Sequence, residues 1–324
     1  MNRSARMPAP LRLSHRARGF TLLELMIAMT ISLLILSALA AIVMGTSSTN
    51  RTRDRASDLQ VNGRYALDQI RRDLQHAGFL GVTSMFLPDQ AISVANIPYS
   101  SVITVANVCD AATVGKISDR IWGTNDSNPY AATCIPAANY LRGDVLVIRG
   151  LNPSVATAPF SASLVYYRSS YEGGSPFVGP TVPPFTAPTR GTPYLEYLLE
   201  EAVYYISPYT NVATESPAVP ALYRVRLSSG PAMVPELVAS GVENLQVRYG
   251  VFQTDDTVRY LRADQMATED WDLVRSVQVS LLMRAATAEA GYTNTTSYDL
   301  SGTTVTVNDS YPRLALSALV QQRN

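Results

Sequence analysis

The chain has 324 residues, of which 47% are hydrophobic and 16% charged. This composition can bury a sizeable core, and it excludes an intrinsically disordered protein. The formal charge is zero overall, but the first 19 residues hold five arginines and no acid, which leaves 21 basic against 26 acidic residues in the remainder. That mildly acidic balance gives no electrostatic reason to expect direct nucleic-acid binding by the body of the protein.

Residues 20–45 form a long apolar run in which Glu24 is the one charge and no proline occurs. As a helix, this run is about 39 Å long, enough to cross a hydrocarbon core of about 30 Å. An ordinary secretory signal has a shorter apolar region, with its cleavage site after that region rather than before it. The run therefore predicts one membrane-spanning helix. Arginines flank it on both sides, so counting them does not orient the helix.

Helical spacing continues over residues 46–81, with apolar or small residues on one stripe: Leu59, Gly63, Leu67, Ile70 and Leu74. We expect one long helix that packs this stripe on a globular head. It should end near Gly78 or Gly81, because glycine supplies a C-terminal cap. The interleaved arginines and aspartates predict a solvated or subunit-facing surface rather than a phosphate-binding track.

Residues 82–324 are predicted to form a β-rich head. β-Branched and aromatic residues dominate six short runs: 144–149, 163–167, 202–206, 221–227, 244–252 and 274–283. Several of these runs alternate, as expected for an antiparallel sheet with one face against the long helix. Segment 171–193, with six prolines and four glycines, is predicted to be an exposed loop. The expected fold class is α+β.

The residues RARGFTLLELMIAMTISLLIL resemble the type IV prepilin signature, in which a basic leader and a glycine precede an aromatic residue and a glutamate at the fifth mature position. The resemblance implies the type IV pilin fold and a cleaved leader peptide, residues 1–19. A prepilin peptidase in the membrane would cut between Gly19 and Phe20 on the cytoplasmic face and methylate the new amine of Phe20. The protein would sit in the inner membrane with a cytoplasmic leader and a periplasmic head, and reach the cell surface on assembly.

Glu24 is the predicted assembly residue, because an unpaired carboxylate inside a bilayer is energetically costly. Its partner is the α-amine of Phe20, either in the same chain or in a neighbouring subunit, and the family resemblance favours the neighbour. The alternative is an acid that is protonated or that snorkels to the headgroups.

The C-terminal half is similar to the PilW class of minor pilins, in the order VPALYRVRL, ELVASGVENLQVRYGV, WDLVRSVQVSLLMR and RLALSALVQQRN. With the helix, the similarity covers residues 11–81 and 196–324. It implies a structural protein without a cofactor that joins other minor pilins, the major pilin and a large adhesin-type tip protein on an inner-membrane assembly platform. Such a complex primes the pilus and supports adhesion and twitching motility. A type II secretion pseudopilin is the alternative function.

Catalytic and metal-binding functions are not predicted. His76 is the one histidine of the mature chain, and the sequence has no Walker loop, HExxH or CxxC motif. Six acids fit no EF-hand spacing and are interpreted as a solvated surface rather than a calcium site: Asp255, Asp256, Asp264, Glu269, Asp270 and Asp272. A membrane-anchored periplasmic enzyme or DNA receptor that reuses the signal is a third hypothesis.

Cys109 and Cys134 are the only cysteines. In the oxidising periplasm that the resemblance implies, we expect them to form a disulfide. The alternative is two separate buried thiols, and neither arrangement implies redox catalysis.

Overall fold

The computed structural model describes residues 19–82, 103, 105–109, 117, 119–170, 173–182 and 194–322. The chain divides into two compact units, Met1–Asp54 and Arg55–Asn324. The predicted leader, apart from Gly19, lies outside the described residues.

One helix, α1 (Leu22–His76), belongs to the first unit up to Asp54 and to the second unit from Arg55 onward. In the first unit it contains a stretch, Leu22–Thr46, that is long and apolar enough to cross a membrane, and none of this stretch is buried. The predicted long helix is confirmed, and its outward apolar side chains remain available to lipid or to other helices.

In the second unit, α1 buries the predicted stripe. Ile70 and Leu74 are fully inaccessible to solvent, and so is Ala66 between the predicted positions. Gly63 lies where the helix touches a strand, because a Cβ atom there would come within 2.3 Å of a methyl group of Leu316. The stripe is therefore a packing surface with a close helix–strand contact.

The helix ends at the predicted glycine cap. Gly78 has a left-handed φ of +73°, and its amide donates to the carbonyl oxygen of Arg149 at 2.9 Å. Gly150 allows this approach, because a Cβ atom there would lie 2.5 Å from the carbonyl oxygen of His76. The last turn of α1 is thereby held against strand β2 (Val145–Ala156).

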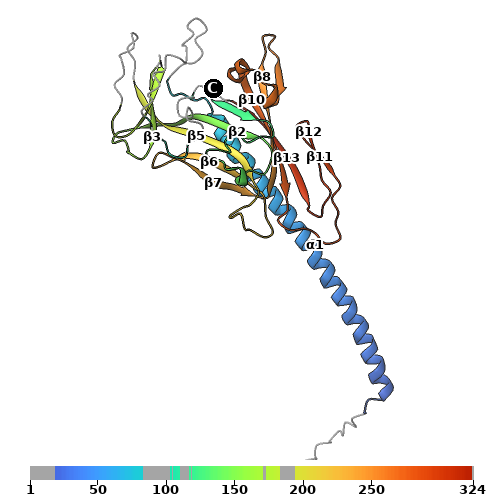
Figure 1. The fold of residues 1–324 in the computed structure, drawn as a ribbon. Helices are drawn as coiled ribbons and strands as arrows, with labels where there is room; N and C mark the ends of the chain where they lie inside the picture. The colour runs from blue at the N-terminus through green and yellow to red at the C-terminus, as the bar shows by residue number, and fades with distance from the viewer. Residues whose placement is uncertain are drawn as a thin grey trace, which may run out of the picture. The chain divides into compact units, whose positions relative to one another are not determined.

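The strands described in the second unit form antiparallel sheets (Figure 1). A seven-stranded sheet has the order β1-β2-β5-β3-β4, with β6 paired to β5 and β7 paired to β6; a four-stranded sheet has the order β13-β10-β8-β9; and β11 pairs with β12. The remaining elements are β1 (Ile121–Thr124), η3 (Ala137–Asn139), β3 (Val165–Ser170), β4 (Gly173–Val178), β5 (Leu195–Ser207), β6 (Ala221–Ser228), β7 (Ala232–Ser240), β8 (Val242–Phe252), β9 (Val258–Leu261), η4 (Ala263–Gln265), η5 (Thr268–Leu273), β10 (Val274–Arg284), β11 (Ser297–Leu300), β12 (Thr303–Thr306) and β13 (Arg313–Gln321).

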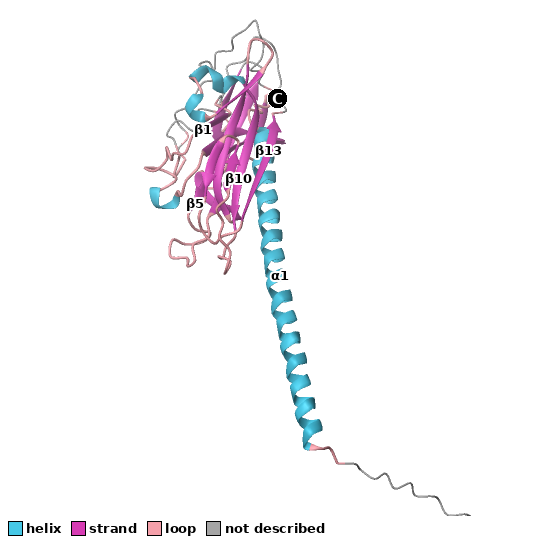
Figure 2. Ribbon diagram, turned by 90° about the vertical axis from the view of Figure 1, so that its right-hand side faces the viewer, coloured by secondary structure: helices cyan, strands magenta, loops and turns pink. Residues whose placement is uncertain are grey.

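The main core is formed by residues of α1 and of the two larger sheets, whose strands run beside the helix in Figure 2. It includes Ile70 of α1, Tyr204 of the seven-stranded sheet and Leu281 of the four-stranded sheet. The chain passes from one sheet to the other at Gly241, whose φ is +79° and whose carbonyl accepts the Arg284 amide at 2.7 Å. A second core lies on the opposite face of the seven-stranded sheet and includes Cys109, Ile135 and Tyr167.

All six predicted strands are present, and the α+β prediction is confirmed. The predicted exposed loop is wrong for Gly173–Val178, which forms edge strand β4 with Phe177 only 4% exposed. An edge strand tolerates proline, and Gly174 is needed because a Cβ atom there would lie 2.2 Å from the ring of Tyr167. The rest of the predicted loop is described at residues 179–182, and residues 171–172 and 183–193 lie outside the described part.

Candidate functional site

The predicted cleavage site lies just before α1. Phe20 is 89% exposed, and the helix begins two residues later. A Cβ atom on Gly19 would meet no other atom within 4 Å, and its backbone is not left-handed. Unlike Gly63 and Gly150, Gly19 is not required by the packing of the described chain.

Glu24 and Thr21 form a capping box at the start of α1. The amide and the hydroxyl of Thr21 both donate to Glu24 Oε2 at 3.0 Å, while the Glu24 amide donates to Thr21 Oγ1 at 3.2 Å. These bonds satisfy backbone donors that a helix N-terminus otherwise leaves without partners. The sequence analysis overlooked this role of Thr21, although the T-x-x-E spacing signals it.

The second oxygen of Glu24 remains available in the described structure. Oε1 accepts no hydrogen bond from any described residue, and no described cation lies within 4 Å of the carboxylate. An ionised carboxylate has about four acceptor positions. The capping box therefore leaves room for a second partner of Glu24.

The structure joins Cys109 and Cys134 by a disulfide, as predicted. Cys109 is 3% exposed and belongs to the second core. The hydroxyl of Thr133 donates to the Cys109 carbonyl at 2.7 Å. The bond fixes the described residues that precede β1 to the loop that follows it.

Two of the six acids that the sequence analysis interpreted as a solvated surface, Asp255 and Asp264, make local contacts. Asp255 accepts from the Thr257 hydroxyl at 2.6 Å and holds the turn between β8 and β9, and Asp264 pairs with Arg262 at 3.1 Å. Within the described ranges, no group of three or more His, Cys, Asp or Glu side chains is placed to hold a metal ion. The side chain contacts thus agree with a solvated acidic surface.

Asp144 is a buried acid beside β2. Burial raises its pKa to about 7, although the amides of Asp126 and Val247 donate to its two oxygens at 3.0 and 2.7 Å. These two bonds tie the loop after β1 and the central strand β8 to one side chain. Asp144 is therefore a structural acid whose charge changes near neutral pH.

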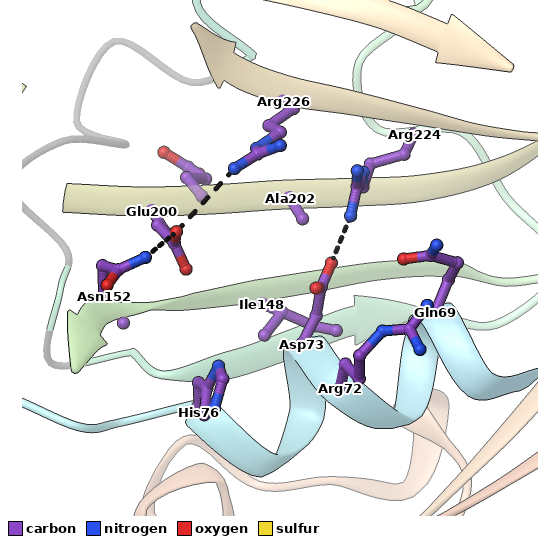
Figure 3. Close-up of a pocket in the computed structure, with 12 residues that line it drawn as sticks. Gln69, Arg72, Asp73, His76, Ile148, Asn152, Glu200, Ala202, Arg224 and Arg226 are labelled. Atoms are coloured by element: carbon purple, nitrogen blue, oxygen red, sulfur yellow. Dashed lines mark hydrogen bonds and ion pairs between the residues drawn. The ribbon is translucent and has the colours of Figure 1, made fainter. Parts of the chain in front are cut away.

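A polar pocket of about 250 Å³ lies at the C-terminal end of α1. Figure 3 shows side chains of the last helical turns facing those of three strands, with Ile148 and Ala202 between them. The strands are β2, β5 and β6, and His76 is one of the lining residues. The sequence analysis predicted no catalytic role for His76 and did not find this pocket, because its walls come from four separate parts of the chain.

Comparisons with known proteins give a family match near each end of the chain. The model of the prokaryotic N-terminal methylation motif matches residues 14–40, and the model of the type IV pilus-assembly protein W (PilW) matches residues 203–324. A solved type IV-like pilin from Thermus thermophilus is 13% identical, with 82% of this chain and 94% of that chain covered at a TM-score of 0.33. The comparison with curated proteins gave no match.

The chain therefore carries two family matches in order along its length. The match to the prokaryotic N-terminal methylation motif includes the start of the apolar helix, and the match to the PilW model lies in the antiparallel head.

Proposed function

We propose that this protein is a minor pilin that helps to prime type IV pilus assembly and sits in the tip complex, where it supports adhesion and twitching motility. The observation that carries the proposal is the combination, in one chain, of the methylation motif, a fully exposed apolar helix and the PilW domain. An apolar helix leaves lipid only by packing against other such helices, and this requirement favours a subunit of a larger assembly.

In this proposal the segments have distinct roles. Residues 1–19 are the cytoplasmic leader, removed by cleavage between Gly19 and Phe20 with methylation of Phe20. Residues 20–45 anchor the protein in the inner membrane and then join the helical bundle. Residues 46–81 connect this anchor to the periplasmic head, residues 82–324. The packing of the described residues does not require glycine at position 19, and this supports the recognition of Gly19 by another protein.

The proposed partners are other minor pilins, the major pilin, a large adhesin-type tip protein and the inner-membrane assembly platform. Glu24 supplies one contact between subunits, through the oxygen that the capping box leaves available. A neighbour's methylated α-amine is a suitable partner, because a buried carboxylate is tolerated when it is paired with a cation.

A gene deletion in the native host tests the function. We expect fewer pili by electron microscopy and less twitching, with both restored by the wild-type gene but not by a Gly19→Leu gene. Co-purification of the tagged protein with other pilins tests its place in the complex, and copies per pilus measured by mass spectrometry test its low abundance. Normal pili and motility together with defective protein secretion would instead support the type II pseudopilin.

A further inference from the structure

The outer edge of strand β13 has no partner among the described residues. This strand has nine residues, lies at the end of the four-stranded sheet and pairs with β10 on one side only. At one end of that pairing the Ala285 amide donates to the Pro312 carbonyl at 2.9 Å. At the other end the Gln322 amide donates to the Arg275 carbonyl at 3.0 Å.

These two bonds fix the direction of every backbone group in β13, because hydrogen-bonded pairs alternate along an antiparallel ladder. Even-numbered residues of β13 bond to β10, and the amides and carbonyls of the odd-numbered residues point away from it. No described residue forms a hydrogen bond with these outward groups. They belong to Arg313, Ala315, Ser317, Leu319 and Gln321.

The other sheet edges in the described part of the chain are short or interrupted. Strands β1 and β9 have four residues each. Strand β4 contains Pro176 and β7 contains Pro235, and proline lacks the amide donor that pairing with a further strand requires. Strand β13 contains no proline, and it carries no charged residue after Arg313. Because an open edge templates pairing with another chain, the unprotected edge of β13 is suited to bind an extended segment.

The side chains along this edge show what an added strand would contact. Leu314 and Leu316 pack against the main core on the α1 side of the sheet. Ala315 and Ser317 are exposed, and Leu319 is 60% exposed. Alternate side chains of an added strand would therefore lie beside Leu319 on one face and beside α1 on the other.

The flank of α1 that lies beside β13 is basic. Gly63 approaches Leu316 of β13, whereas Asp73 faces the seven-stranded sheet (Figure 2). At about 100° per residue, Arg64 and Arg71 lie beyond Gly63 on the side of the helix away from Asp73. Both arginines are exposed, and neither forms an ion pair with any described residue.

This charge distinguishes between two kinds of partner. A second copy of the chain, joined edge to edge, would bring Arg64 and Arg71 of both molecules along one seam, where like charges repel. Asp68 lies further round the helix from β13 than either arginine. An added strand with acidic side chains on the α1 side avoids the repulsion and gives both arginines a partner.

We propose that the outer edge of β13 binds an extended acidic segment of another protein, which joins the four-stranded sheet as a further strand. The acidic side chains of this segment face Arg64 and Arg71, and its apolar side chains cover Leu319. The inference goes beyond the proposed role in pilus assembly, because the edge belongs to the second unit and its binding is measured without any pilus.

Backbone NMR on the full chain in detergent micelles tests the site. The probe is the peptide acetyl-Val-Glu-Val-Glu-Val-Glu-Val-amide, and its counterpart has lysine in place of glutamate. We expect saturable binding of the Glu peptide and at least about fivefold weaker binding of the Lys peptide. Hydrogen exchange of the Ser317 and Leu319 amides should slow by about tenfold or more, whereas the Ala318 amide, already bonded to β10, should be unaffected.

Ser317→Pro removes one outward amide and leaves the bonds to β10 in place. It should raise the dissociation constant by at least about tenfold, and the matched control Ser317→Ala, which keeps the amide, should change it by less than about twofold. Arg64→Gln and Arg71→Gln should each raise it by about threefold. Arg72→Gln is their control, because Arg72 is also exposed but lines the pocket on the other side of α1.

A Glu peptide with N-methylated alternate amides gives the same test on the wild-type protein, so the result does not depend on the folding of Ser317→Pro. This peptide should not bind. Lack of saturation by the unmodified Glu peptide up to about 5 mM, equal binding of the Lys peptide, or unchanged exchange of the Ser317 and Leu319 amides would overturn the proposal.

Discussion

The two parts of α1 have the same secondary structure but differ in how their side chains are buried. Along Leu22–Thr46 the helix is apolar on all sides, and none of it is buried within the protein. Along Arg55–His76 it is apolar on one stripe only, and Ile70 and Leu74 on that stripe are completely buried. The difference shows that the arrangement of apolar residues identifies the surroundings of a helix: lipid or other helices in the first case, and the protein's own sheets in the second.

The glycines of these two parts differ in the same way. Gly63 is fixed by its close approach to Leu316 inside the protein, whereas Gly19 touches nothing within 4 Å. Changes in the first part of the chain should therefore affect processing and assembly, and changes in the second part should affect folding. Each prediction below tests this division, beginning with the largest effect.

Gly19→Leu should abolish maturation. The peptidase must approach the backbone closely at the cleavage site, and a branched side chain there obstructs that approach. The precursor should accumulate with a normally folded head, because nothing in the described structure lies near Gly19. Mass spectrometry checks the N-terminus. A mature chain beginning with N-methylated Phe20 in this variant would refute the cleavage assignment.

Ile70→Ala should lower the free energy of unfolding of the head by about 3 to 4 kcal/mol, because it leaves a cavity at a fully buried position. Leu34→Ala is the control: Leu34 is 68% exposed, and its effect should stay below about 0.5 kcal/mol. Denaturant titration of the full chain in detergent, followed by tryptophan fluorescence, measures both. The only tryptophans, Trp122 and Trp271, lie in the head and report its unfolding alone. Equal losses of unfolding free energy in Ile70→Ala and Leu34→Ala would contradict the difference in packing between the two parts of α1.

The sequence predicted those elements in which the local spacing of apolar residues indicates which side chains are buried. The helix, its glycine end and the six apolar strands belong to this group. Strand β13 was quoted only for its family resemblance, because its Ala-, Leu- and Gln-containing sequence is not typical of a strand, and long-range pairing with β10 sets its conformation. Strand β4 was missed because its prolines and glycines suggest a loop, while packing against Tyr167 decides the outcome.

The candidate sites show the same limit. Gly19, Phe20 and Glu24 were predicted because the prepilin resemblance is carried by neighbouring residues, and the disulfide between Cys109 and Cys134 was predicted because the chain has no other cysteine to pair. The pocket at the C-terminal end of α1 could not be found this way. Its lining residues come from α1, β2, β5 and β6, which lie far apart in the sequence.

Replacing Cys109 and Cys134 by serine should lower the free energy of unfolding of the head by roughly 3 kcal/mol, because the bond closes a loop between cysteines 25 residues apart. Membrane insertion should be unchanged, since the anchor belongs to the other unit. Tryptophan fluorescence during denaturation measures the stability, and reduction of the wild-type protein should reproduce the loss. Free, alkylatable thiols in protein from freshly isolated envelopes would contradict the disulfide.

The stability of the head should fall as the pH rises from 5 to 7. Burial raises the pKa of folded Asp144 to about 7, above its unfolded value of 3.8, so the folded protein binds the proton more tightly. Raising the pH through this interval removes that proton and should cost about 2 kcal/mol. Asp144→Asn should flatten this part of the pH profile in denaturant titrations. An identical slope in both proteins would show that Asp144 does not carry the effect.

Glu24→Gln should have the smallest effect on the protein itself and a selective effect on its assembly. Glutamine retains an oxygen that accepts the Thr21 bonds, so the capping box and the start of α1 should persist. The variant loses only the negative charge. If Glu24 pairs with a neighbour's α-amine, that amine is left without a counter-ion in a low-dielectric bundle, which is unfavourable.

Thr21→Val is the matched control for this change, because it removes the hydroxyl of the capping box and keeps the charge of Glu24. We expect Glu24→Gln to reduce co-purification with partner pilins by about threefold or more, and Thr21→Val to reduce it less, with the same melting temperature of the head in both. Pilus counts by electron microscopy should follow the same order. If Thr21→Val impairs assembly as strongly as Glu24→Gln, then Glu24 acts through the helix start rather than through a neighbour. Wild-type assembly in Glu24→Gln cells would show that the charge of Glu24 is not an assembly contact, and it would favour a side chain that snorkels to the headgroups. The difference between the two parts of α1 would then be supported by their burial alone.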